Sequence, residues 1–240
     1  MKYMGSKARL SKDIANILNR EIEKRNSVFY DVFVGGFNLL PAVDASIIYA
    51  NDICSYITTF YEEFLSGNFT PPSSLSEDLY NDIKNNKDSY PKPLVAFAGY
   101  ACSFGGKFFG GYARSFNTKG EPRDHPNEQY RALIKRKKHL KDKKLIISNT
   151  CYKNIDIIPN SVVYCDPPYV TTTEYKTKFC HEDFYTWCEN LVKEKNCSVY
   201  VSEYFVNRKG WEVVFSKKLK TNIRDKNNST RQEKLYKVVL

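Results

Sequence analysis

The sequence lacks the features that mark secreted, membrane-spanning and zinc-binding proteins. It has only three histidines and no C-x-x-C pair, and its seven cysteines are an odd number. Neither a disulfide framework nor a metal site is therefore expected. There is no apolar signal core at the N-terminus and no run of about 18 apolar residues. We expect free, mostly buried thiols, no metal, no membrane partner and a cytoplasmic location.

Acidic residues are also scarce relative to basic ones. The 240 residues include 37 Lys and Arg against 27 Asp and Glu, which gives a net charge of +10. Such an excess favours a polyanionic partner such as nucleic acid, although it also serves solubility. Hydrophobic residues make up 42% and aromatic residues 15% of the chain. This composition is typical of a globular α/β protein with a substantial core.

The expected elements alternate between helix and strand, as in a doubly wound parallel sheet. A stretch rich in proline and glycine interrupts this order after residue 65. We therefore expect one α/β domain over residues 1–65 and 145–240, with a mostly helical and loop insertion over residues 66–144. The expected helices cover residues 7–23, 38–45, 55–65, 130–144 and 184–193, and the expected strands cover residues 28–33, 47–50, 145–149, 161–165 and 198–202, with a final antiparallel pair from residues 213–215 and 235–240.

Asp166-Pro167-Pro168-Tyr169 is the most informative motif in the chain. It directly follows a β-branched run, and so lies at the carboxyl end of a strand, where open α/β sheets bind ligands. An exocyclic amino group is a weak nucleophile because its lone pair is delocalised into the ring. Asp166 and the Pro167 carbonyl can each accept a hydrogen bond from one N–H of this amino group, and the two prolines fix the backbone. Tyr169 offers a flat face for an extruded base.

This tetrapeptide resembles the catalytic motif of amino-methylating DNA methyltransferases. From Lys2 to Tyr236 the chain is similar to Dam-type adenine-N6 methylases, especially phage-encoded ones. The resemblance implies a Rossmann-like methyltransferase fold that uses S-adenosylmethionine. It also implies transfer of a methyl group to the amino group of a flipped adenine in double-stranded DNA. The residues do not indicate a target sequence, an oligomeric state or a partner restriction nuclease.

The resemblance also implies a methyl-donor site near the N-terminus. Residues 3–7 are similar to the family's N-terminal motif, in which an aromatic residue and a lysine contact the donor. Residues 31–38 are similar to its glycine loop, except that Val32 stands where proline is common and Phe37 replaces a small residue. Asp52 is expected to bind ribose hydroxyls, and Tyr152 is expected beside the adenine of the donor. The implied donor contacts are Tyr3, Lys7, Phe33, Gly35, Gly36, Phe37, Asn38, Asp52, Tyr152 and Asp166.

Taken one at a time, these stretches have simpler interpretations. Ser6 can cap an ordinary helix start, Asp52 can be a helix N-cap, and Tyr152 can be a core residue. The two glycines can form a plain turn at the end of a strand.

Residues 103–114 interleave aromatic residues, glycines and cations, which suits a loop that approaches a duplex. The stretch resembles the family's target-recognition segment. By position, Arg114 is then expected to read a guanine, Tyr112 to wedge into the duplex and Lys107 to contact phosphate. The alternative is a mobile glycine-rich loop with an aromatic anchor. The helix expected over residues 130–144 is rich in Lys and Arg, and we interpret it as a solvated face. Residues 227–231 are interpreted as a polar loop between the last strands.

Three other functions remain open. Cytosine-N4 methylation uses related chemistry, although serine at position 166 would favour it. Methylation of RNA or of a protein amide would suit asparagine there. The third is a catalytically inactive DNA-binding relative, which the departures at Val32 and Phe37 in the glycine loop keep open.

Overall fold

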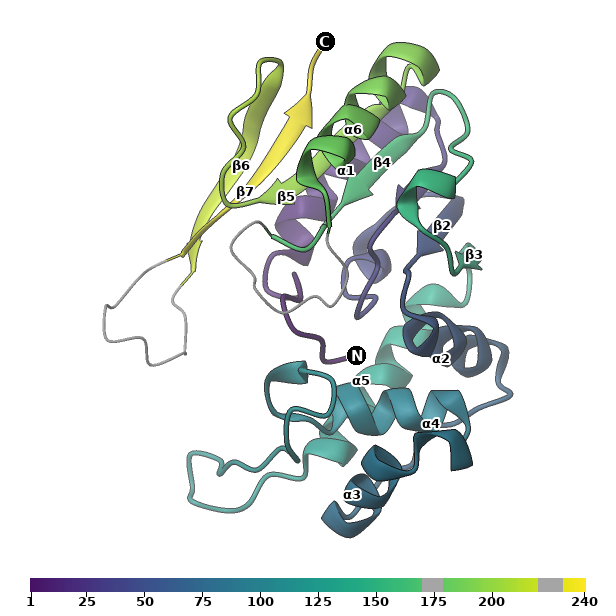
Figure 1. Ribbon diagram of the computed structural model, residues 1–240, viewed down its shortest axis with the longest axis vertical. Helices are drawn as coiled ribbons and strands as arrows, with labels where there is room; N and C mark the ends of the chain where they lie inside the picture. The colour runs from purple at the N-terminus through teal and green to yellow at the C-terminus, as the bar shows by residue number, and fades with distance from the viewer. Residues whose placement is uncertain (170–178, 220–230) are drawn as a thin grey trace.

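A seven-stranded mixed β-sheet forms the centre of the protein (Figure 1). The computed structural model describes residues 1–169, 179–219 and 231–240. The strand order is β3-β2-β1-β4-β5-β7-β6; the first five strands in the chain run parallel, and β7 pairs antiparallel with both β5 and β6. The strands are β1 (Phe29–Asp31), β2 (Ile47–Asn51), β3 (Lys144–Ser148), β4 (Val162–Cys165), β5 (Ser198–Glu203), β6 (Trp211–Leu219) and β7 (Arg231–Val238).

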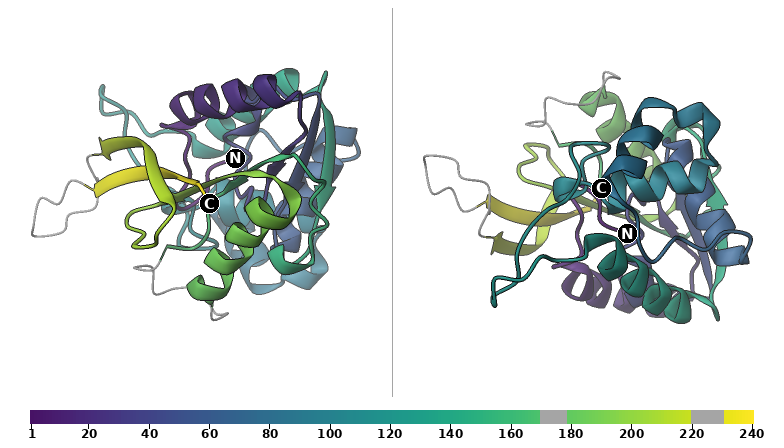
Figure 2. Two further views of the ribbon diagram at one scale, coloured as in Figure 1. Left: turned by 90° about the horizontal axis from the view of Figure 1, so that it is seen from above. Right: turned by 90° about the horizontal axis from the view of Figure 1, so that it is seen from below.

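Helices α1 (Ser11–Arg25) and α6 (His181–Lys195) cover opposite faces of this sheet (Figure 2). Successive residues of a strand point to opposite faces, and two hydrophobic clusters follow from this alternation. Phe29 of β1 joins the cluster beneath α1, whereas its neighbour Tyr30 joins the cluster beneath α6. The short strand β1 is buried on both faces, as expected of a parallel sheet covered by helices.

A helical lobe stands beside the sheet, in the lower half of Figure 1. Its rings and aliphatic side chains belong to the same hydrophobic cluster that packs under α1, so the lobe and the sheet share one core. The helices of this lobe are α2 (Ser55–Ser66), α3 (Glu77–Asn85), α4 (Lys92–Ala96), which continues into a π-helical turn (Phe97–Ala101), and α5 (His125–Leu140), with short 3-10 turns at Lys87–Ser89 and Phe104–Gly106.

The expected α/β fold class is confirmed, and the five parallel strands occur within two residues of their expected bounds. The final antiparallel pair also forms, but β6 (Trp211–Leu219) is longer than expected and β7 (Arg231–Val238) begins four residues earlier. The helix expected over residues 38–45 is wrong, because only the 3-10 turn Leu40–Ala42 forms there. The backbone of Phe37 is left-handed, and Val43 is already extended toward β2, so no helix can propagate between them.

Three helix starts also differ from the expected ones, and one of them is α6, which begins at His181 rather than at residue 184. Helix α1 begins at Ser11 rather than at residue 7, and Ser6 Oγ accepts a hydrogen bond from the Ala8 N–H in the turn before it. Helix α5 begins at His125 rather than at residue 130. The Asp124 side chain caps it by accepting the Asn127 N–H at 3.1 Å, and Pro126 occupies its first turn. Proline was interpreted there as a loop former, whereas it opens the helix.

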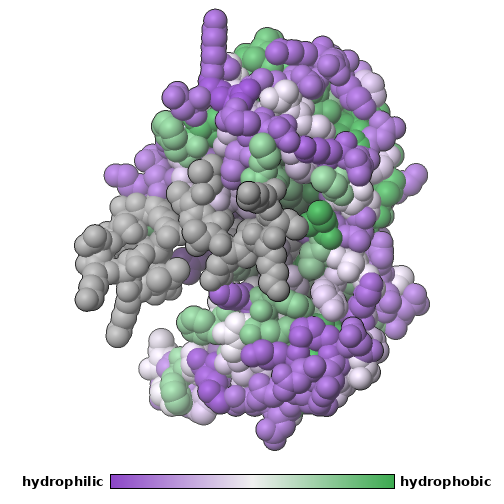
Figure 3. Space-filling model, viewed as in Figure 1, coloured by the Kyte–Doolittle hydropathy of each residue, from purple (hydrophilic) through white to green (hydrophobic). Residues whose placement is uncertain are grey.

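Most of the surface seen in Figure 3 is hydrophilic, and hydrophobic residues gather at mid-height between the sheet and the helical lobe. Within the described residues no helix is long and apolar enough to cross a bilayer. The thiols are free, and Cys102, Cys165, Cys188 and Cys197 are buried, while Cys180 is exposed. Residues 227–230 of the expected polar loop lie outside the described residues.

Candidate active site

Asp166 lies where the expected catalytic motif predicts it, directly after β4. Every residue of β4 is buried, and the chain leaves the sheet at Asp166 because the two following prolines cannot continue a central strand. Tyr169 is buried, and its ring meets the ring of Tyr204 edge-on at a centroid distance of 4.5 Å. The motif therefore stands at the carboxyl edge of the parallel strands.

A buried ion-pair network surrounds this motif. Lys7 Nζ lies 2.8 Å from Asp166 Oδ1 and 3.8 Å from Glu233 Oε2. It also lies 4.6 Å from the centre of the Tyr169 ring, and the Tyr169 hydroxyl donates to Glu233 Oε2 at 2.9 Å. Four side chains from the N-terminal segment, the motif and β7 thus meet at one point.

Burial and charge act in opposite directions in this network. Burial disfavours the ammonium of Lys7, but attraction to Asp166 and Glu233 outweighs it and raises the pKa of Lys7. Burial raises the pKa of Asp166, and the nearby ammonium opposes that rise. Lys7 was expected to bind the carboxylate of the methyl donor. In the structure, its ammonium is bound by Asp166.

The glycine loop follows β1 and packs against the N-terminal segment. Gly35 has φ +46°, and a Cβ there would lie 2.9 Å from the Tyr3 ring. A Cβ on Gly36 would lie 2.6 Å from the Met1 carbonyl oxygen. Both positions therefore require glycine, because Tyr3 and the start of the chain approach the loop backbone closely.

Val32 and Phe37, the two residues of this loop that differ from the family pattern, pack into the core. Phe37 has φ +54°, is 0% exposed, and stacks on Tyr61 with ring centres 3.6 Å apart. Val32 is buried beneath α6, and its N–H donates to the Tyr164 carbonyl of β4. The Phe37 ring therefore points away from the surface of the loop, and its packing offsets the cost of a left-handed backbone at a residue other than glycine.

Asp52, which follows the last residue of β2, binds the backbone of the glycine loop. Its Oδ2 accepts the Gly35 N–H at 2.9 Å, and its Oδ1 accepts the Cys54 N–H at 2.9 Å just before α2. Burial raises the pKa of this carboxyl group, and the two backbone N–H groups oppose that rise. The N-cap residue of α2 is Cys54, so Asp52 is not the helix cap of the simpler interpretation.

Asp31 ends β1 and faces the same region. It is 3% exposed, and its Oδ1 has no hydrogen-bond partner among the described residues. Burial raises its pKa well above the usual value, and the negative charges of Asp166 and Asp52 add to the rise. Asp31 begins the loop motif at residues 31–38, but the sequence predicted no role for it. Its position after a buried strand was the available indication.

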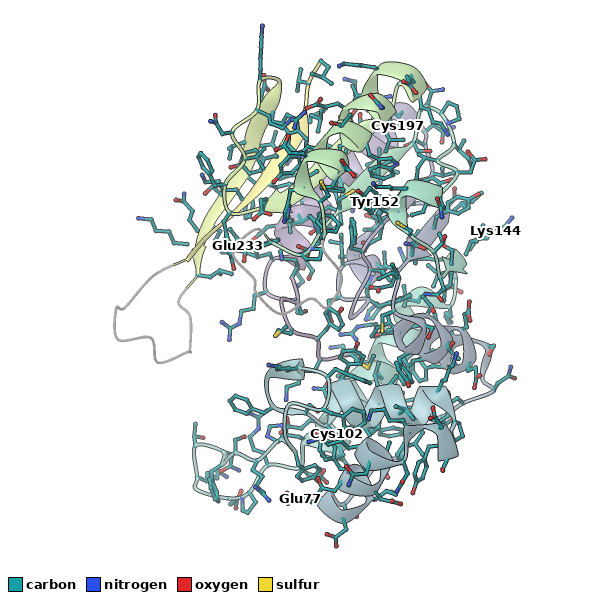
Figure 4. The ribbon with its side chains drawn as sticks, viewed as in Figure 1. Glu77, Cys102, Lys144, Tyr152, Cys197 and Glu233 are labelled. Atoms are coloured by element: carbon teal, nitrogen blue, oxygen red, sulfur yellow. The ribbon has the colours of Figure 1, made fainter. Side chains whose placement is uncertain are left out.

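The other expected donor contacts lie around the loop. Asn38 joins three segments, because its side chain donates to Ser6 Oγ at 2.6 Å and accepts from Arg136 of α5 at 2.7 Å. Phe33 and Tyr152 pack against each other with ring centres 5.9 Å apart. Tyr152 is 8% exposed and lies beneath α6, among the rings of Phe179, Phe184 and Trp187 (Figure 4).

The basic helix α5 is only partly the solvated face that was expected. Arg136 binds Asn38, and the ammonium of Lys137 donates to the Phe64 carbonyl at the end of α2. These two cations join α5 to the glycine loop and to α2. A cation on a helix gives no local indication of such a contact, so the sequence could not predict it.

The expected DNA-contacting residues lie on the helical lobe. Tyr112 is half-buried, its hydroxyl donates to the Leu75 carbonyl at 2.6 Å, and its ring meets Tyr80 edge-on. The Arg114 side chain is 72% exposed and forms an ion pair with Glu77 (Figure 4). The prominent aromatic residues on this part of the surface are Phe104 and Phe116, which are 69% and 70% exposed.

The first part of the chain is similar to a known family. Residues 3–97 match the family model of D12 class N6 adenine-specific DNA methyltransferases. This match confirms the expected likeness to adenine-N6 methyltransferases for that stretch.

Within the described residues no group of three or more His, Cys, Asp or Glu side chains is arranged to hold a metal ion.

Curated relatives extend the similarity further along the chain. Over 194 residues the chain is 26% identical to Type II methyltransferase M.FokI of Planomicrobium okeanokoites and 25% identical to modification methylase StsI of Streptococcus sanguinis. Each alignment covers 72% of this chain and 29% of the relative, so the chain spans less than a third of the length of either. Among solved structures, the rRNA methyltransferase aviRa from Streptomyces viridochromogenes is 12% identical with a TM-score of 0.46, covering 96% of this chain and 84% of that one.

Proposed function

From the D12-class segment that this chain carries, we propose that the protein is a site-specific DNA adenine-N6 methyltransferase that uses S-adenosylmethionine. The observation that carries this proposal is the position of Asp166. It stands at the carboxyl end of β4, half-buried beside the buried ammonium of Lys7. The glycine loop and Asp31 stand at the end of β1, the strand adjacent to β4. The residues proposed to hold the methyl donor and the residue proposed to hold the adenine thus lie at one edge of the sheet.

The residues at the end of β1 fit the proposed donor. The donor carries an activated methyl group on a cationic sulfur together with an ammonium group, and a cation suits the buried, unpaired oxygen of Asp31. Gly35 and Gly36, which pack against Tyr3 and Met1, are proposed to contact the donor through their backbone. The further residues proposed to hold it are Tyr3, Lys7, Phe33, Phe37, Asn38, Asp52, Tyr152 and Asp166.

The Asp166 motif supplies the groups that the adenine requires. The Asp166 carboxylate accepts one N–H of the amino group and the Pro167 carbonyl accepts the other, which increases electron density on the nitrogen. Pro168 fixes the backbone, and Tyr169 stacks on the flipped base. Asp166 has to be ionised to accept this N–H, and the ammonium of Lys7 favours that state by opposing the effect of burial on its pKa.

Residues 66–144 are proposed to be the part that recognises double-stranded DNA. Arg114 is exposed enough to read a base edge, and Lys107 is proposed to contact phosphate. Tyr112 was the expected wedge, but its hydroxyl is tied to the Leu75 carbonyl. Phe116, which is exposed beside the turn at residues 117–120, is better placed to enter a base step.

The Phe37 contacts favour an active enzyme over an inactive DNA-binding relative. The departure from a small residue at this position was the reason for the inactive alternative. Because the ring is buried against Tyr61, it does not project from the glycine loop toward a bound donor. Binding of S-adenosylmethionine by the purified protein would separate the two possibilities.

Asp166→Ala tests the proposal. We expect transfer of a labelled methyl group from S-adenosylmethionine to unmethylated DNA to fall by at least about 1000-fold, with a far-ultraviolet circular dichroism spectrum like that of the unchanged protein. Asp142→Ala removes the same charge at an exposed position and should remain active. Hydrolysis of the product should yield N6-methyladenine, whereas N4-methylcytosine would overturn the assignment of the base. Equal rates for Asp166→Ala and the unchanged protein would refute the assignment of the site.

A further inference from the structure

Glu233 is the member of the active-site network to which the preceding chemistry gives no role. It lies on β7, which pairs with β5, and its side chain is 12% exposed (Figure 4). Its Oε2 accepts the Tyr169 hydroxyl at 2.9 Å and lies 3.8 Å from Lys7 Nζ. The same oxygen therefore contacts the residue proposed to stack on the base and stands close to the cation that is bound to Asp166.

The position of Lys7 creates a conflict that Glu233 can resolve. Lys7 Nζ lies 2.8 Å from Asp166 Oδ1, so the ammonium already binds the carboxylate that an adenine amino group has to reach. Once displaced, a buried ammonium needs another anion, because an unpaired buried charge is costly. Glu233 is the next described carboxylate, about 1 Å farther away, and a change of Lys7 rotamer can reach it.

Glu233 also fixes the stacking surface. The hydrogen bond from the Tyr169 hydroxyl restrains the ring, which also meets the ring of Tyr204 edge-on. The Lys7 ammonium lies 4.6 Å from the centre of the Tyr169 ring. When the ammonium moves toward Glu233, it stays beside this ring. One carboxylate thereby couples the release of Asp166 to the orientation of the stacking ring.

We propose that Glu233 is a positioning residue of the methyl-transfer reaction, which holds the Tyr169 ring and receives the Lys7 ammonium when the amino group of the target adenine takes its place at Asp166. This inference rests on the proposed function. The charged and titratable groups that face the ammonium from the surrounding elements are Asp166, Glu233, Tyr169 and Tyr204.

Glu233→Gln is the primary test, because glutamine still offers an oxygen to the Tyr169 hydroxyl but removes the charge. Single-turnover methylation of unmethylated genomic DNA with labelled S-adenosylmethionine should slow by at least about tenfold. The dissociation constant for S-adenosylmethionine should change by less than about twofold. Glu212→Gln on β6 removes an exposed charge and controls for weaker attraction to DNA.

A double-mutant cycle with Lys7→Met separates the proposed role from a structural one. Without the ammonium there is nothing for Glu233 to receive, so Glu233→Gln should cost less than about threefold in the Lys7→Met protein. An equal loss in both backgrounds would overturn the inference, as would a rate for Glu233→Gln within about twofold of the unchanged protein. If Glu233→Gln does not fold, Glu233→Asp should retain activity relative to Glu233→Ala, and equal rates for these two would overturn the inference. Failure of the unchanged protein to methylate DNA would instead refute the proposed function itself.

Discussion

Arg114 is the residue through which the proposed DNA specificity can be tested. Its guanidinium is paired with Glu77 on the surface, and an exposed pair of this kind contributes little stability. A guanine edge can therefore displace Glu77 at small cost, since a bidentate arginine–guanine contact is worth about 1–3 kcal/mol.

Arg114→Ala is expected to lower the preference for the cognate site over a substituted site by about 10- to 100-fold, with a smaller effect on nonspecific DNA binding. Once the methylated site has been mapped by methyl-sensitive sequencing, competition between cognate and substituted duplexes measures this preference. Glu77→Gln is the matched control and should bind cognate DNA at least as tightly as the unchanged protein. A preserved preference in Arg114→Ala would exclude Arg114 as the base reader.

Gly36 is constrained by packing rather than by its backbone angle. An alanine Cβ would lie 2.6 Å from the Met1 carbonyl oxygen, so either the loop or the N-terminal segment has to shift. Gly36→Ala should lower the free energy of unfolding by about 1–3 kcal/mol and weaken binding of S-adenosylmethionine. Thermal denaturation and calorimetric titration measure the two effects, and an unchanged affinity would show that the donor does not depend on this loop.

Individual site residues differ in how far the sequence could predict them. Asp166 was identifiable because its role requires a particular residue type after a buried strand. Glu233 was not, because a glutamate on an edge-proximal strand has no local feature that distinguishes it from Glu212. Tyr112 was assigned by position, and the structure turns its hydroxyl toward Leu75. Such contacts are tertiary, and they depend on which distant segment packs alongside.

At the scale of secondary-structure elements, Glu21 joins one helix to two strands. Its carboxylate on α1 accepts hydrogen bonds from Arg25 of the same helix, from Ser198 of β5 at 2.7 Å and from Lys237 of β7 at 3.1 Å. Burial works against its charge, but these hydrogen bonds outweigh that effect and lower the pKa of Glu21 to about 2.

The lowered pKa of Glu21 gives a stability that depends on pH. The contribution is present above the ordinary pKa of 4.5 and is lost as the pH falls toward about 2, because the unfolded chain takes up the proton first. Glu21→Gln should lower the free energy of unfolding at pH 7 by about 1–3 kcal/mol and flatten the fall in stability below pH 4.5. Urea titrations at several pH values test this. Glu23→Gln, exposed on the same helix, should behave like the unchanged protein.

The elements that were predicted correctly carry strong periodic or β-branched patterns. Helix α2 and strand β4 were both expected within a residue of their observed bounds. The alternation of helix and strand predicted a parallel sheet, but it did not predict the order of the strands. The failed helix at residues 38–45 reflects a competing demand, because Phe37 is used in the core and Asn38 joins three segments.

Over the whole molecule, the net charge of +10 predicts strongly salt-dependent DNA binding. Each phosphate contact releases condensed counterions, so the logarithm of the affinity should fall linearly with the logarithm of the salt concentration. Lys107→Gln should reduce the steepness of this line by about one charge equivalent. Fluorescence anisotropy with a labelled duplex at several salt concentrations measures the slope, and an unchanged slope would place Lys107 away from the phosphates.

The active site draws Lys7 from the first residues of the chain and Glu233 from β7, which inserts between β5 and β6. Pairing β7 into this position requires β5 to be in place, and contacts so distant in sequence form slowly. During refolding, helical content should therefore recover before methyl-transfer activity does. Because the role proposed for Glu233 needs the Lys7–Glu233 contact, catalytic competence should be one of the last properties that the folding chain acquires, and an incompletely folded molecule should not modify DNA.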